Sequence, residues 1–154
     1  MGKFGYTSNM EADEKLLIAI MRISELYKKA CHSVFGNYRL TFPQYTVLRV
    51  LEGSENGQNT ITNASKVMLV SGANLTGVAK RLERIGFLIR KGDPNDERVT
   101  LLEITPKGRQ TLKNIAKDKD NLIQKLLQDY SDDQISDLLT SLKKCLNRAL
   151  KRQE

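Results

Sequence analysis

The fold is decided by residues 71–98, which read SGANLTGVAKRLERIGFLIRKGDPNDER. Ser71 offers a hydroxyl that can cap a helix, and Gly86 offers a stop signal at its other end. Between them, apolar residues recur at helical spacing and form one stripe: Leu75, Val78, Ala79, Leu82 and Ile85. The opposite side carries small, amide and cationic groups: Ala73, Asn74, Gly77, Lys80, Arg81 and Arg84. Such a helix can enter the major groove of DNA, because no bulky apolar side chain stands in the way.

A short helix is predicted before this one and a β-hairpin after it. The short helix covers roughly residues 62–69. The hairpin strands are residues 87–89 and 99–104, and a polar turn from Gly92 to Arg98 forms a long tip. Two short helices followed at once by a hairpin are typical of a winged helix-turn-helix, in which the second helix is the recognition element.

Long amphipathic helices flank this module on both sides. Residues 12–35 place apolar side chains at alternating steps of four and three, and Gly36 ends the pattern. Thr41 and Pro43 open a second helix that runs to about Glu52, and residues 53–60 are expected to form a loop. Thr105 and Pro106 begin a long helix, and residues 131–134 have the spacing of a capping box that starts a last one. The expected fold class is therefore mainly α with a small β-hairpin wing.

Positive charge concentrates beside the predicted recognition helix. The chain has 25 Lys and Arg against 18 Asp and Glu, which favours an anionic partner. Between residues 74 and 92, Glu83 is the single acid among five bases: Lys80, Arg81, Arg84, Arg90 and Lys91. Each feature also has a local explanation, because a basic face can be merely solvated, Gly77 can allow close helix packing, and Asn74 can be a cap. Their joint occurrence favours binding to double-stranded DNA.

Other functional classes find little support in the sequence. It has no Ser-His-Asp set, no cluster of metal ligands and no glycine-rich phosphate loop, so we expect no enzyme, no metal and no cofactor. The apolar runs are too short for a membrane span, and nothing marks the chain for secretion, so a cytoplasmic protein is expected. Cys31 and Cys145 are expected to be reduced thiols, and His32 a partly exposed helix residue.

Four segments in register resemble the MarR (multiple antibiotic resistance regulator) family of bacterial transcription regulators. They are residues 40–44 (LTFPQ), 70–77 (VSGANLTG), 93–98 (DPNDER) and 102–108 (LEITPKG). Asp96 and Arg98 match the Asp-x-Arg signature of the family's wing. The chain departs from the common pattern at Gly77, where arginine is frequent, and at Leu69, where glycine often precedes the turn.

The resemblance implies an obligate homodimer whose two winged lobes bind a pseudo-palindromic operator. By position, it assigns contacts with phosphates or bases to Ser71, Ala73, Asn74, Thr76, Gly77 and Arg81. It also implies that Arg98 enters the minor groove, where a narrow groove concentrates negative potential, and that Asp96 holds Arg98 in position.

A dimer would bury apolar stripes that a small winged module alone cannot cover. The candidate interface residues are Leu16, Ile20, Ile23, Leu138, Leu142 and Leu146. The alternative is that these helices pack within one chain. We expect a single domain over residues 1–154, with the winged module at about 40–112 and dimerisation helices at about 11–36 and 113–152.

Family resemblance further implies a repressor that a small aromatic effector, or oxidation of a cysteine, releases from DNA. Cys31 lies near the end of the first helix, whereas the family's peroxide sensors carry their reactive cysteine nearer its start. Candidate pocket residues are Phe35, Tyr45 and Met68, and the alternative for each is plain core. The competing function is a winged-helix module that docks a protein and has no affinity for DNA. Salt dependence separates the two, because binding through several phosphates weakens steeply as salt rises.

Overall fold

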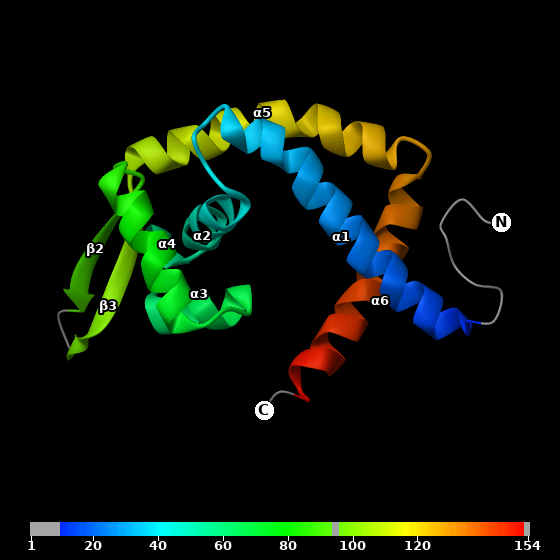
Figure 1. The fold of residues 1–154 in the computed structure, drawn as a ribbon, viewed down its shortest axis with the longest axis horizontal. Helices are drawn as coiled ribbons and strands as arrows, with labels where there is room; N and C mark the ends of the chain where they lie inside the picture. The colour runs from blue at the N-terminus through cyan, green and yellow to red at the C-terminus, as the bar shows by residue number, and fades with distance from the viewer. Residues whose placement is uncertain (1–9, 94–95, 153–154) are drawn as a thin grey trace. The chain divides into compact units, whose positions relative to one another are not determined.

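The computed structural model describes residues 10–93 and 96–152. Its elements are α1 (Ala12–Gly36), α2 (Phe42–Glu52), a 3-10 turn (Glu55–Gly57), β1 (Gln58–Thr60), α3 (Ile61–Met68), α4 (Gly72–Arg84), β2 (Leu88–Asp93), β3 (Asp96–Ile104), α5 (Pro106–Leu127) and α6 (Asp132–Leu150). The predicted fold class is confirmed: helices predominate, and the wing follows α4 directly (Figure 1). The chain divides into two compact units, Met1–Lys119 and Asp120–Glu154.

Side-chain caps begin the helices where the sequence indicates them. The Thr41 hydroxyl accepts the backbone N–H of Gln44, whose side chain in turn accepts the Thr41 N–H. Ser71 accepts the N–H of Asn74 at 3.2 Å and so begins α4. The helix before it, α3, begins slightly earlier than predicted, because Thr60 supplies its cap. Its C-cap is Leu69, which has a left-handed φ of 54°, a conformation in which glycine would be less strained.

Two glycines fix the junction between α4, the wing and α5. Gly86 has a φ of +77°, which turns the chain from α4 towards β2. At Gly108, a Cβ atom would lie 2.4 Å from the carbonyl oxygen of Phe87. The first turn of α5 therefore packs directly against the backbone that leads into the wing.

The wing belongs to a three-stranded antiparallel sheet in the order β1-β3-β2. Strand β1, which pairs Gln58 with Glu103 and Thr60 with Leu101, lies in the segment expected to be only a loop. The expectation was wrong because three polar residues paired through their backbones leave no pattern of alternating hydrophobicity.

The long tip predicted for the hairpin is also wrong. The strands extend to Asp93 and Asp96, and Gly92 still pairs with Thr100. Between these two pairs the register shifts, and it passes over residues 97–99 of β3. Polar residues form this outer ladder through backbone bonds, which explains why an apolar pattern does not reveal it. Pro94 and Asn95, which the sequence places in the tip, lie outside the described residues.

The hydrophobic core of the first unit lies between α2, α3, α4 and the sheet, which gather together in Figure 1, and the end of α1 and the first half of α5 add side chains to it. Its largest fully buried side chains include Phe35, Leu48, Leu51, Leu75, Leu82, Leu88, Leu102 and Ile115. On α4, the predicted stripe is buried at four of its five positions, and Ile85 is half-buried. The outer face of α4 is therefore left to solvent.

The terminal helices are covered far less. On α1, Cys31 and Phe35 are the buried residues, and α6 has none. Leu138 is 46% exposed and Leu146 is 51% exposed. Among the described residues, no helix is both long enough and apolar enough to cross a membrane.

Candidate nucleic-acid interface

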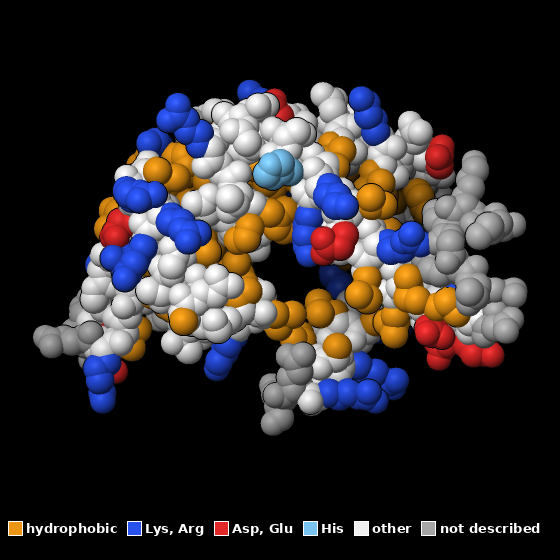
Figure 2. Space-filling model, in the orientation of Figure 1, with side chains coloured by type: hydrophobic (Ala, Val, Ile, Leu, Met, Phe, Trp, Pro, Cys, Tyr) orange, Lys and Arg blue, Asp and Glu red, His pale blue; other side chains and the backbone are white. Residues whose placement is uncertain are grey.

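The outer face of α4 is exposed, slender and cationic. Ala73 and Asn74 are exposed near its start, and Gly77 is half-buried one turn later. Lys80, Arg81 and Arg84 are exposed along its second half, and none of them forms an ion pair with any residue that the structure describes. In Figure 2, several Lys and Arg side chains lie over the part of the molecule where Figure 1 shows α4 and the wing. The face combines small groups with unpaired positive charge.

The structure excludes two alternative roles for residues of α4: close helix packing at Gly77 and helix capping by Asn74. A Cβ added at Gly77 would meet nothing within 4 Å, so this glycine does not serve close helix packing. Asn74 does not cap the helix either, because the cap oxygen comes from Ser71. Both residues thus lie on an open surface, and neither is required there for helix packing or for capping.

The two hydroxyls near the start of α4 differ in what they can offer a phosphate. Ser71 uses an oxygen lone pair for the cap and keeps its O–H as a donor. Thr76 donates its O–H to the carbonyl of Gly72 at 2.8 Å, so its oxygen can only accept. A phosphate offers no proton, so Ser71 suits a phosphate and Thr76 suits a base edge or a methyl group.

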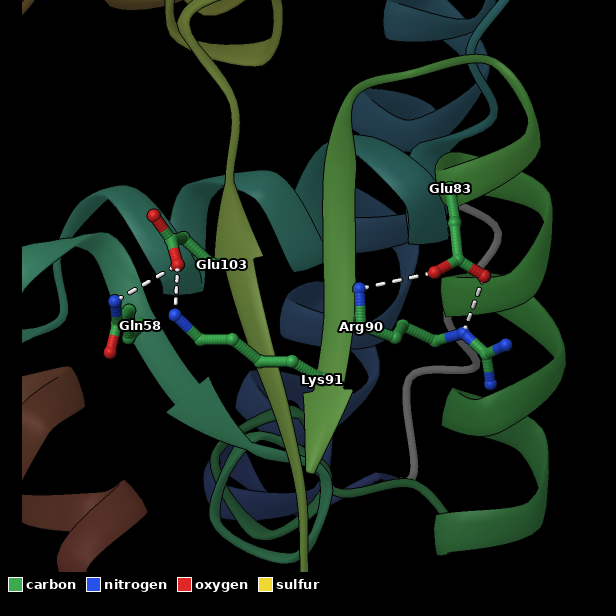
Figure 3. Close-up of polar contacts among 5 residues, drawn as sticks. All are labelled: Gln58, Glu83, Arg90, Lys91 and Glu103. Atoms are coloured by element: carbon green, nitrogen blue, oxygen red, sulfur yellow. Dashed lines mark hydrogen bonds and ion pairs between the residues drawn. The ribbon is translucent and has the colours of Figure 1, made fainter. Parts of the chain in front are cut away.

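Arg90 connects the wing to α4. Its Nε donates to Glu83 Oε2 at 2.7 Å, and its backbone N–H donates to Glu83 Oε1 at 3.1 Å (Figure 3). The hydrogen bond from the Arg90 guanidinium is the main cause that lowers the pKa of Glu83 below its ordinary value. Arg90, expected among the cations that face DNA, is thus paired with the single acid of this segment.

A second polar cluster lies on the opposite side of the hairpin in Figure 3. Glu103 Oε2 accepts from Lys91 Nζ at 2.5 Å and from Gln58 Nε2 at 3.0 Å. The Lys91 contact is the largest cause that lowers the pKa of Glu103. Sequence reasoning missed the contact of Gln58 because β1 has no sequence signal, and it missed the Lys91–Glu103 pair because that pair depends on the register of β2 against β3.

Arg98 stands out from the wing. Its side chain is 92% exposed, and it lies in the part of β3 where the register with β2 shifts. The expected contact with Asp96 is present, because Asp96 Oδ1 accepts the Arg98 Nε at 3.2 Å and the Arg98 backbone N–H at 3.0 Å. A β-bulge is a common device for aiming one side chain away from a sheet.

The remaining candidate residues fall into two groups. The expected interface residues are half-buried or exposed in the single chain: Leu16, Ile20, Ile23, Leu138, Leu142 and Leu146. Of the candidate pocket residues, Phe35 and Tyr45 are buried with their rings stacked at 4.3 Å between centroids, and Met68 is half-buried at the end of α3. Lys119 Nζ donates to the Tyr45 hydroxyl at 3.0 Å.

The thiols and the histidine also differ in exposure. Cys31 is fully buried, while Cys145 and His32 are exposed. In the part of the chain that the structure describes, no three His, Cys, Asp or Glu side chains come together as metal ligands.

Comparison with known proteins finds transcription regulators. The family model described as "Transcriptional regulator SarA/Rot" matches residues 29–115. The HTH-type transcriptional regulator BilQ of Clostridioides difficile is 30% identical over 132 residues, which are 84% of this chain and 86% of that protein. The HTH-type transcriptional regulator TtmR of Methylorubrum extorquens is 35% identical over 109 residues, 71% of this chain. The match spans 55% of TtmR, so this chain corresponds to about half of that relative.

Solved structures share the fold. BldR from Sulfolobus solfataricus, a transcriptional regulator, superimposes with a TM-score of 0.76 at 25% identity and covers 90% of this chain and 99% of its own. A mutant MarR from E. coli complexed with operator DNA gives a TM-score of 0.76 at 24% identity, over 86% of this chain and 94% of its own.

Proposed function

This chain belongs to the SarA/Rot family of transcriptional regulators and has the fold of the MarR regulators, and from that premise we propose that it binds duplex DNA sequence-specifically as a MarR-type homodimer. The observation that carries the proposal is the outer face of α4. Lys80, Arg81 and Arg84 are exposed and have no acidic partner among the described residues, next to a helix start that is free of bulk. Unpaired cations beside a slender helix are what contact with a duplex requires.

In the proposed complex, α4 enters the major groove with its N-terminal half. Ala73, Asn74, Thr76 and Gly77 face base edges there, while the Ser71 hydroxyl and the three cations contact phosphates. Arg98 reaches the neighbouring minor groove from the wing, held by Asp96. The exposed position of Arg98 and the open space at Gly77 support this arrangement.

The homodimer is proposed to form through α1 and α6. Both helices leave apolar side chains exposed that a second copy would cover. Two-fold symmetry would place the recognition helices on half-sites about one turn of DNA, roughly 10 bp, apart. The operator is therefore proposed to be pseudo-palindromic, and residues 1–154 to form a single MarR-like domain in which the terminal helices carry the dimer contacts.

We further propose that the chain acts in the cytoplasm as a repressor released by a small aromatic effector. Phe35, Tyr45 and Met68 are the candidate contacts of that effector. The stacked rings of Phe35 and Tyr45 show that aromatic groups already pack well in this region. Binding of an effector there would have to separate or displace these rings.

Salt dependence of binding tests the proposal. A duplex selected by the wild-type chain from a random-sequence library is titrated with protein at several salt concentrations. Contacts from six to eight cations in a dimer predict that log K falls against log salt with a slope of about −5 to −7. If the library yields no enriched duplex and low salt gives no binding, the chain is instead a winged-helix module that docks a protein.

A further inference from the structure

Glu83 is a carboxylate on a surface otherwise suited to a polyanion. It lies in the last turn of α4, and its side chain is 35% exposed. A negative charge there repels phosphate and by itself weakens DNA binding, so a carboxylate at this position requires a second role that compensates. Both of its oxygens accept hydrogen bonds from the same wing residue, Arg90.

The two bonds are of different kinds. Strand β2 is an edge of the sheet, so a backbone N–H that points away from β3 has no strand to bond to. Glu83 Oε1 accepts such an N–H from Arg90, while Oε2 accepts the Arg90 guanidinium. The carboxylate thus holds the wing by its main chain and by a side chain at once.

The contact lies between the buried base of β2 and its exposed outer end, so it can set the direction of the outer part of the wing. Leu88 is buried and anchors the base of β2, while Lys91 and Gly92 beyond Arg90 are exposed. The strand continues for three residues past Arg90 to Asp93, about 10 Å at the usual rise per residue. A tilt of the wing at Arg90 would therefore be enlarged at its outer end, where Arg98 stands.

We propose that Glu83 is a positioning residue that fixes the wing relative to α4, and that Arg90 serves this contact instead of neutralising a phosphate. The inference rests on the proposed DNA-binding function. It reassigns Arg90, which the sequence places among the DNA-contacting cations, and leaves the phosphate contacts of this segment to Lys80, Arg81 and Arg84. The pKa of Glu83, lowered chiefly by the Arg90 hydrogen bond, keeps the carboxylate ionised at neutral pH.

The sign of one substitution separates positioning from simple electrostatics. Glu83→Gln removes a negative charge near DNA, which by charge alone should tighten binding. If Glu83 positions the wing, the same substitution weakens binding to the selected duplex by about five- to tenfold, the range of one charge-assisted hydrogen bond at a partly exposed site. Equal or tighter binding by Glu83→Gln overturns the proposal.

Arg90→Gln supplies the second arm. We expect a similar loss of affinity with an unchanged salt slope, and a double variant no weaker than the weaker single one, since both act through one contact. If Arg90 contacts phosphate, the slope instead falls by about 0.9 for each protomer, which refutes the proposed role. Glu103→Gln is the matched control, because it removes another paired carboxylate of the wing, on the opposite side of the hairpin. Its binding should be unchanged or slightly tighter.

A measurement without DNA keeps this inference separate from the proposed function. Hydrogen exchange at the Arg90 amide should be at least about tenfold faster in Glu83→Ala than in the wild-type chain, because the amide loses its acceptor. Unchanged exchange would show that the contact does not hold the wing in solution. Failure of the wild-type chain to bind any duplex would instead refute the DNA-binding proposal.

Discussion

Helices α4 and α6 each carry an apolar stripe at helical spacing, but only the stripe of α4 is covered. On α4, Leu75 and Leu82 are fully buried against the rest of the winged unit. On α6, Leu138 and Leu146 stay about half exposed, and no residue of the helix is buried. Good caps begin both helices, at Ser71 and Ser131, so their local structure is equally well specified.

The difference shows where each helix obtains its stability. Helical stability in proteins comes mostly from packing an amphipathic face, and α4 finds that packing within its own chain. The apolar face of α6 has no such cover in the chain alone, so a second copy is the proposed source. The winged unit should then be stable by itself, while the terminal region should depend on association.

A charged substitution in the apolar stripe of α6 should have the largest effect, because this stripe is proposed to depend on a second copy of the chain. Leu142→Glu is expected to dissociate the dimer at micromolar concentration and to weaken duplex binding at least about a hundredfold, because two half-sites are no longer bound together. Light scattering after size exclusion measures the mass. Thr140→Glu adds the same charge on the opposite side of the helix and should remain dimeric. A dimeric Leu142→Glu chain would contradict the proposed interface.

Core substitutions in α4 should lower the free energy of unfolding by the same amount whether or not the chain dimerises. Leu82→Ala leaves a cavity at a fully buried position and should lower the free energy of unfolding by about 3 kcal/mol. Urea denaturation at two protein concentrations is the measurement. The loss in Leu82→Ala should be the same at both, whereas Leu138→Ala should lower stability mainly at the low concentration. Equal behaviour of the two variants would remove the distinction between the helices.

The wing offers a change that touches neither helix. Arg98→Ala should weaken binding to the selected duplex by about 10- to 100-fold while leaving the dimer mass and the melting temperature unchanged. The reason is that the Arg98 side chain is almost fully exposed and packs against no core residue. An unchanged titration would refute the role of Arg98 in the minor groove.

The smallest effect is expected at a glycine on the open face of α4. Gly77→Ala should stabilise the fold by about 0.5–1 kcal/mol, because alanine favours helix and the added Cβ meets nothing. Gly108→Ala is the counterpart and should destabilise strongly, since its Cβ would lie 2.4 Å from the Phe87 carbonyl oxygen. Thermal unfolding checks both. Destabilisation by Gly77→Ala would mean that this face is covered in the native protein.

Most of the fold could be predicted from the sequence because its signals are local. Caps at Thr41, Ser71 and Ser131 and the stop at Gly86 mark helix ends through hydrogen bonds made within a few residues. Strand β1 depends on backbone pairing with residues more than 40 positions away, and the outer ladder of the wing depends on backbone pairing between polar residues of one hairpin. Such pairing leaves no trace in composition or periodicity, so both were missed.

The candidate site also contains local features that the sequence predicts and one contact between two elements that it does not predict. The exposed face of α4 follows from helical periodicity, and the contact between Asp96 and Arg98 lies within one short segment. The pairing of Glu83 with Arg90 joins a helix to a strand. The sequence supplies the two charges but not the turn geometry that brings them together, so it places Arg90 with the unpaired cations.

The two hydrogen bonds to one oxygen of Asp96 should reduce the conformational entropy that Arg98 loses when the chain binds DNA. Because Oδ1 accepts both the Arg98 main-chain N–H and its Nε, Arg98 is held at two points while the two terminal nitrogens of its guanidinium remain for a groove. Immobilising a long side chain costs up to about 2 kcal/mol, and ordering a backbone residue adds about 1–2 kcal/mol. With its main-chain N–H and Nε already bonded, Arg98 should lose less entropy on entering a groove than an arginine without these bonds.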